Sequence, residues 1–106
     1  MTPAAPPRAL SPTEVVTQLS RLSGWQLRGD GTEVGIEKTF RFDNYNLVMS
    51  FVNAVAFIAQ DMNHHPSMTV HYQSCVLHYN THDVAGLSAL DFAAAQRVDA
   101  WLSGTQ

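Results

Sequence analysis

Apolar residues recur at two different spacings along this chain of 106 residues. Recurrence every three or four positions over residues 12–22, 44–63 and 88–103 predicts three amphipathic helices, because a helical turn takes 3.6 residues. Alternation of apolar and polar residues over 32–42, 68–73 and 76–81, together with a short stretch at 25–27, predicts four strands. The expected order is helix, two strands, helix, two strands, helix.

The predicted helix ends carry recognisable capping residues. Ser11 is followed by a proline and, three positions on, by Glu14, which is the S-x-x-E capping box with the favoured proline placement. Asp43 is expected to cap the second helix. Pro66 disfavours helical geometry at His65, so the second helix is expected to end near residue 63 or 64.

Consecutive hairpins imply an antiparallel sheet, and strands with one apolar face bury that face against helices. The predicted fold is α+β, a two-layer sandwich of a four-stranded antiparallel sheet with three helices on one face. Residues 1–10 are rich in proline and alanine and are expected to be a disordered tail, and residues 11–106 form a single domain. The core side of the second hairpin is expected to carry Met68, Val70, Tyr72, Leu77 and Tyr79.

Composition narrows the classes of partner. A net charge of −3 and a pI near 5.9 leave no basic patch, which argues against nucleic-acid binding and against an anionic membrane surface. Charged residues make up 14% of the chain, against roughly 25% in typical soluble domains, so we expect part of the surface to be covered in a homo-oligomer. With one cysteine, no long apolar segment and no signal-like start, the expected location is cytoplasmic.

All 5 histidines lie between residues 61 and 91, and histidine is the side chain that most readily exchanges a proton near neutral pH. His64 is expected at the C-terminus of the second helix, where unpaired carbonyls favour a protonated ring suited to act as an acid. His65 and His82 are also expected at the ends of elements, where a rigid scaffold can present reactive groups. The alternative for each is a capping or solvent-facing histidine.

Two further readings of this segment stay open. Asp91 stands three residues after Ser88, so it is the acidic arm of a capping box, a carboxylate of a site, or both, since one oxygen can accept backbone hydrogen bonds while the other orients a histidine. Clustered histidines can also bind zinc, but the chain has no HExxH or CxxC motif, and adjacent histidines rarely aim at one ion. We therefore predict no metal site.

The segment resembles a known family at several points. His64-His65-Pro66, with Tyr72, His82 and Asp91 at matching intervals, resembles the motif of the pterin-4a-carbinolamine dehydratases, also known as dimerization cofactors of a hepatocyte nuclear factor. THDVAGLSALD and FVNAVAFIAQDMNHHP resemble the corresponding loop and second helix of that family. The resemblance extends over most of the chain, from about residue 10 to residue 102.

The resemblance implies a hydro-lyase that removes water from a 4a-hydroxytetrahydropterin to give the quinonoid dihydropterin, as part of tetrahydropterin recycling. It implies the same order of helices and strands, and dimers that continue the sheet across subunits and often pair into tetramers through helices. The partner is then a pterin substrate, and no metal or other cofactor is required because the reaction is an acid/base elimination.

The resemblance also implies roles for individual residues. His64 and His82 are the general acid/base candidates, and Asp91 is the carboxylate that orients the site. Gln60 departs from the ionisable residue that the family usually has there. The alternative is therefore a catalytically weak or inactive member that acts as a protein-binding, assembly or coactivator-like module. Substrate contacts are expected from His65, which is also a secondary acid/base candidate, and from Asn63, Thr81 and Tyr72.

Overall fold

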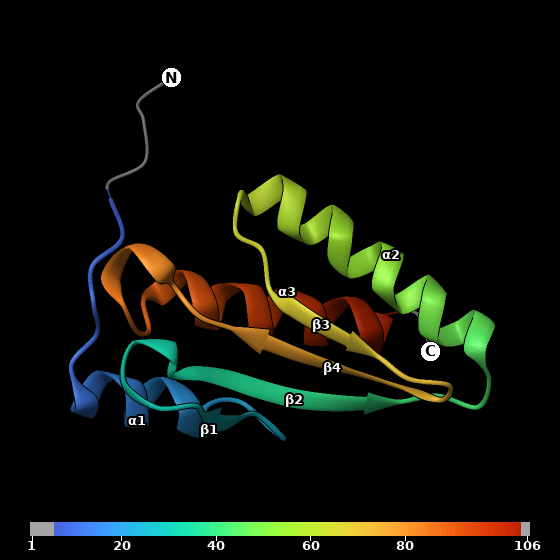
Figure 1. Ribbon diagram of the computed structural model, residues 1–106, viewed down its shortest axis with the longest axis horizontal. Coiled ribbons are helices and arrows are strands. Elements are labelled where there is room, and N and C mark those ends of the chain that lie inside the picture. The colour runs from blue at the N-terminus through green and yellow to red at the C-terminus, as the bar shows by residue number, and fades with distance from the viewer. Residues whose placement is uncertain (1–5, 105–106) are drawn as a thin grey trace.

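The computed structural model describes residues 6–104 and has the predicted order of elements (Figure 1). The strands form one antiparallel sheet in the order β1-β2-β4-β3, which confirms the α+β prediction. None of the helices in this part of the chain has the length and hydropathy to cross a membrane. The elements are α1 (Pro12–Ser20), β1 (Gln26–Arg28), η1 (Gly31–Glu33), β2 (Gly35–Arg41), α2 (Tyr45–Met62), β3 (Ser67–Val70), β4 (Ser74–Tyr79), η2 (His82–Val84) and α3 (Ala89–Gly104), the two η elements being short 3₁₀ helices.

Local sequence signals set the helix ends. The capping box is present at α1, where the Glu14 backbone N–H donates to Ser11 Oγ at 3.2 Å and the Ser11 N–H donates to Glu14 Oε1 at 2.9 Å. The predicted cap of α2 was one residue early: Asn44, not Asp43, accepts the hydrogen bond from Leu47, at 2.9 Å. At its other end α2 stops at residue 63, in the left-handed conformation that ends many helices.

The core lies between one face of the sheet and the three helices. Phe40 of β2 pairs with Cys75 of β4, and both side chains are buried on this face. The same core includes buried Phe51 of α2 and Val98 of α3, and Leu19 of α1 packs against it. In the view of Figure 1, α3 runs behind the β3–β4 hairpin. The helices therefore cover one face, as predicted.

The second hairpin departs from the prediction. Leu77 and Tyr79 are fully buried as expected, but Met68, Val70 and Tyr72 are 36%, 39% and 75% exposed. Met68 pairs with Leu77 and so points to the core side, but β3 is the edge strand and the helices do not cover it. Tyr72 lies in the turn, because β3 ends at residue 70 and not at residue 73.

The N-terminal segment folds back along the domain. Residues 1–10 were expected to be a loose tail; residues 1–5 lie outside the described part of the chain. Within residues 6–10, the Leu10 N–H donates to the Leu87 carbonyl oxygen at 2.9 Å, and the Leu10 side chain packs against the core. The Arg8 guanidinium donates to both carboxylate oxygens of Glu14, at 3.0 and 2.8 Å. This segment therefore lies against α1 and the loop before α3.

Candidate active site

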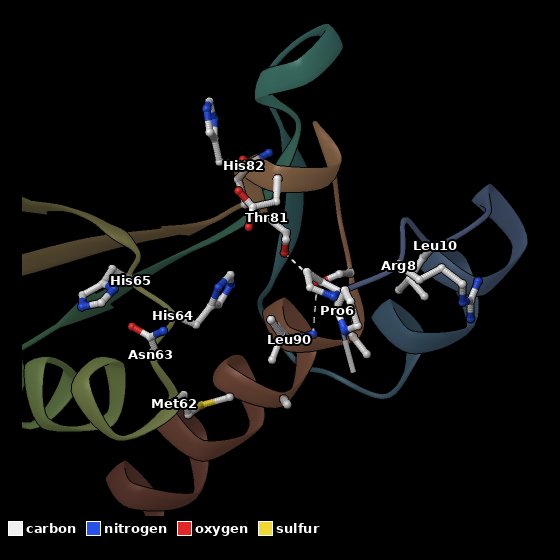
Figure 2. Close-up of a pocket in the computed structure, with 16 residues that line it drawn as sticks. Pro6, Arg8, Leu10, Met62, Asn63, His64, His65, Thr81, His82 and Leu90 are labelled. Atoms are coloured by element: carbon white, nitrogen blue, oxygen red, sulfur yellow. Dashed lines mark hydrogen bonds between the residues drawn. The ribbon is translucent and has the colours of Figure 1, made fainter. Parts of the chain in front are cut away.

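A pocket of about 840 Å³ opens at the end of the sandwich where α2 stops, β4 stops and α3 begins. The volume is in the range of roughly 300–1,000 Å³ that is typical of small-molecule sites. The N-terminal segment forms another part of the wall (Figure 2). The lining residues include Arg8, Leu10, Asn63, His64, His65, Asn80, Thr81, His82, Ser88 and Leu90.

A buried ionisable pair joins α2 to α3 beside the pocket, which one of its members, His64, lines. His64 follows the left-handed residue that ends α2, and its backbone N–H donates to the Ala59 carbonyl oxygen at 3.1 Å. Its ring atom Nε2 lies 2.7 Å from Asp91 Oδ1, and the two residues are 9% and 0% exposed. Because an ionised carboxylate only accepts hydrogen bonds, Nε2 carries the proton and donates it. The carboxylate thereby fixes both the tautomer and the position of the imidazole.

Asp91 is held by hydrogen bonds to its second oxygen. Oδ2 accepts from the Thr81 hydroxyl at 2.7 Å and from the Ser88 backbone N–H at 3.0 Å. The Thr81 hydroxyl has one proton, which it donates to Asp91, so the Ser88 hydroxyl, 2.7 Å away, donates to Thr81. Asp91 thus accepts the Ser88 N–H at the start of α3, as the acidic arm of a capping box does, and is also the partner of His64, while the Ser88 hydroxyl accepts from the Leu90 N–H. The two readings of this residue are compatible, because each uses a different carboxylate oxygen.

Three of the other predicted site residues have exposed side chains in the same pocket. His65, His82 and Asn63 line the same pocket as His64 but are exposed to solvent. Figure 2 shows the rings of His64, His65 and His82 as separate groups that do not converge on one point. Within residues 6–104, no three His, Cys, Asp or Glu side chains are grouped as a metal site requires.

The structure does not bring Tyr72 to this pocket. Tyr72 lies in the β3–β4 turn, where its ring stacks on Tyr45 with centroids 6.5 Å apart. Gln60 is exposed on α2 and does not line the pocket either. Thr81 does line it, but the Thr81 hydroxyl is committed to Asp91. Of the expected substrate contacts that line the pocket, His65 and Asn63 therefore have the more accessible side chains.

Sequence reasoning missed two residues of this arrangement. Ser88 is predicted as the helix cap paired with Asp91 but not as a site residue, yet its hydroxyl and its N–H both support the carboxylate network. Tyr79 was assigned to the core alone, yet its ring stacks on the His64 imidazole. The spacing from Ser88 to Asp91 was a usable signal for the first, whereas the contact of Tyr79 with His64 depends on tertiary structure.

Comparison with known proteins identifies the family. The family model described as pterin 4 alpha carbinolamine dehydratase matches residues 8–101. A protein of Paracidovorax citrulli, provisionally named pterin-4-alpha-carbinolamine dehydratase, is 58% identical over 99 residues, covering 93% of this chain and 85% of that protein. A protein of Chromobacterium violaceum with the same provisional name is 42% identical over 91 residues, covering 86% of this chain and 81% of that protein.

Solved structures agree with this relationship. The crystal structure of a transcriptional coactivator/pterin dehydratase from Brucella melitensis superimposes with a TM-score of 0.80 at 29% identity, covering 88% of this chain and 97% of that one. A pterin dehydratase-like RuBisCO assembly factor of the alpha-carboxysome has a TM-score of 0.61 at 22% identity, covering 73% of this chain and 87% of that one, and supports the fold alone. The chain belongs to the pterin 4-alpha-carbinolamine dehydratase family.

Proposed function

We propose that this protein dehydrates a 4a-hydroxytetrahydropterin to the quinonoid dihydropterin, as a step of tetrahydropterin recycling. The observation that carries the proposal is the buried His64–Asp91 pair in the wall of a pocket large enough for a pterin. Membership of the dehydratase family supports the same reaction.

The reaction is an elimination of water. The bond between C4a and the hydroxyl oxygen breaks, the adjacent ring nitrogen loses its proton, and the electron pair of that N–H bond forms the new double bond to C4a. One group must protonate the departing hydroxyl and another must accept the nitrogen proton. The net product besides the dihydropterin is one water molecule, so acid/base side chains are sufficient machinery.

We assign His64 as the base that accepts the nitrogen proton, and not as the acid that its place at a helix C-terminus suggests, because its Nε2–H is held by Asp91. Its Nε2–H is committed to Asp91, and within residues 6–104 its Nδ1 has no hydrogen-bond partner. In the neutral ring Nδ1 is the unprotonated nitrogen and can accept a proton. The Asp91 carboxylate then faces the imidazolium that forms. This arrangement orients the base before the substrate binds.

We assign His82 as the acid that protonates the departing hydroxyl, with His65 as a pterin contact or a secondary acid. Both rings line the pocket and both are exposed, so each can exchange protons with solvent between turnovers. Asn63, which lines the pocket between Met62 and His64, provides an amide for hydrogen bonds to the pterin ring.

The test is the conversion of enzymatically generated 4a-hydroxytetrahydrobiopterin, followed by ultraviolet absorbance over the spontaneous background. His64→Ala is expected to lower kcat/KM by about 10²- to 10⁴-fold, the usual contribution of one acid or base. The matched control is His71→Ala, since His71 is exposed in the β3–β4 turn and does not line the pocket. Wild-type rates in a folded His64→Ala protein would refute the assignment.

We also propose a cytoplasmic homodimer, able to pair into a tetramer, in which the β3 edges of two copies extend the sheet. β3 is an edge strand, and its side chains Met68 and Val70 are 36% and 39% exposed. On α2, Phe57 is 78% exposed, which supports a second contact through helices. Light scattering is expected to give at least twice the mass of the 11.7 kDa chain; a monomer at micromolar concentration would contradict it.

A second candidate is a binding module that keeps the fold without the activity. The exposed apolar residues of α2 favour it, because they lie apart from the residues that line the pocket. The Brucella melitensis relative is described as a transcriptional coactivator as well as a pterin dehydratase. The assay separates the two candidates: a folded, oligomeric wild-type protein with no rate above background supports the binding module.

A further inference from the structure

Tyr79 is the last residue of β4, and its ring is buried between the core and the His64 side chain. The residue is 0% exposed. Its ring stacks on the His64 imidazole, with centroids 5.9 Å apart and planes inclined by 14°. Trp25 packs against the same tyrosine ring, with centroids 6.0 Å apart. Tyr79 is therefore a fixed surface against which the imidazole lies.

The hydrogen bond to Asp91 and the stack on Tyr79 restrain different motions of His64. A single hydrogen bond at Nε2 fixes the position of that atom but permits the ring to turn about the line from Nε2 to Asp91 Oδ1. The last side-chain torsion of histidine has broad minima, so the torsion itself does not set the ring plane. A near-parallel aromatic neighbour does set it, because tilting the ring would break the stack.

The phenol oxygen of Tyr79 takes no part in this restraint. It is buried, and it has no hydrogen-bond partner among residues 6–104. Burial, and after it the negative charge of Asp91, raise the pKa of Tyr79 from 10.0 to about 12. The phenol therefore stays protonated near neutral pH and is no base there. What Tyr79 offers the site is the flat face of its ring.

We infer that Tyr79 is a positioning residue, whose stacked ring holds the plane of His64 so that Nδ1 stays aimed at the reacting nitrogen of the pterin. The inference rests on the proposed dehydratase function for its consequence in turnover. Its structural part, the restraint of the His64 ring, stands independently of any substrate.

The experiment compares two substitutions at Tyr79. Tyr79→Leu removes the flat face, and Tyr79→Phe keeps it while removing the phenol oxygen. We expect Tyr79→Leu to lower kcat about tenfold or more while KM changes less than about threefold, because a displaced base affects the chemical step more than binding. We expect the conservative variant Tyr79→Phe to restore the activity that Tyr79→Leu loses.

Long-range ¹H–¹⁵N spectra of the imidazole give a readout that needs no substrate. Wild type and Tyr79→Phe are expected to show His64 with its proton on Nε2 and with ring protons shifted upfield by the stacked tyrosine or phenylalanine. Tyr79→Leu is expected to lose the upfield shift while the proton stays on Nε2, because the hydrogen bond to Asp91 remains. If the wild type does not accelerate dehydration, the proposed function fails, and these spectra still test Tyr79.

The matched control is Phe40→Leu, which removes another buried aromatic ring of the core. Phe40 packs on Trp25 and Phe51 and does not line the pocket. The variant Phe40→Leu is expected to lower the free energy of unfolding but to leave kcat and the His64 spectrum unchanged. Equal losses in Tyr79→Phe and Tyr79→Leu, or a wild-type rate and spectrum in Tyr79→Leu, would overturn the inference. If Tyr79→Leu does not fold, an absent upfield shift of His64 in the wild type overturns it as well.

Discussion

Replacing Asp91 by asparagine changes the site with almost no change in shape. In the wild type, the Thr81 hydroxyl and the Ser88 N–H both donate to Asp91 Oδ2. In the variant, the amide oxygen Oδ1 can take the place of Oδ2 and accept both hydrogen bonds. The amide nitrogen of the variant then takes the place of Asp91 Oδ1, which in the wild type lies 2.7 Å from His64 Nε2. Two donors cannot share that contact, so His64 must move its proton to Nδ1 to accept from the amide. The nitrogen assigned as the base is thereby protonated and blocked.

The size of the effect follows from these contacts. Losing the correct tautomer removes the contribution of the base, so kcat is expected to fall by about 10²- to 10⁴-fold. The free energy of unfolding is expected to fall by about 1 kcal/mol, because the hydrogen bonds to a charged carboxylate become hydrogen bonds to a neutral amide. Asp91 is 0% exposed, so solvent cannot compensate for the weaker contacts. Substrate binding is expected to change little, since Asp91 does not line the pocket.

The matched control is Asp99→Asn on the same helix. Asp99 accepts from Trp25 Nε1 at 2.9 Å and from Lys38 Nζ at 3.0 Å, and it does not line the pocket. Absorbance kinetics and urea denaturation of both variants separate the two effects. Both are expected to lose stability, and only Asp91→Asn is expected to lose turnover. A wild-type kcat in Asp91→Asn, or an equal loss of kcat in Asp99→Asn, would refute the reasoning.

Two further predictions concern the surroundings of the site. The hydrogen bonds from Arg8 and then from the Ser11 N–H lower the pKa of Glu14 from 4.5 to about 2. The Arg8–Glu14 contact therefore stabilises the folded state above the unfolded pKa and is lost as pH falls through about 2; a carboxyl ¹³C titration with its midpoint near 4.5 would contradict this. A Cβ on Gly35 would overlap the Tyr79 carbonyl oxygen and the His78 ring. Gly35→Ala is therefore expected to lower the free energy of unfolding by about 1–3 kcal/mol, measured by urea denaturation. A decrease below about 0.5 kcal/mol would argue against that overlap.

Much of the fold was predictable because its signals are local. The capping box at Ser11 sets the start of α1 through contacts within a few residues, and the proline at residue 66 indicates that α2 ends before it, which it does, at left-handed Asn63. The order β1-β2-β4-β3 is a property of the whole sheet, and in this order β3 is an edge strand. The apolar pattern of Met68 and Val70 indicates the face toward which they point, but it carries no information about whether a helix covers that face. Their exposure could therefore not be predicted from alternation.

The site shows the same division between local and global information. The sequence predicts a histidine just after the C-terminus of one helix and a carboxylate in the first turn of another. Each placement is favourable by itself, because a helix is negative at its C-terminus and positive at its N-terminus. What the sequence does not reveal is that β4 ends between these two helix ends and brings them together, so that His64 and Asp91 meet at 2.7 Å. The Asp91 carboxylate then accepts hydrogen bonds at the start of its own helix and from the His64 ring, and the pair can be buried beside the pocket.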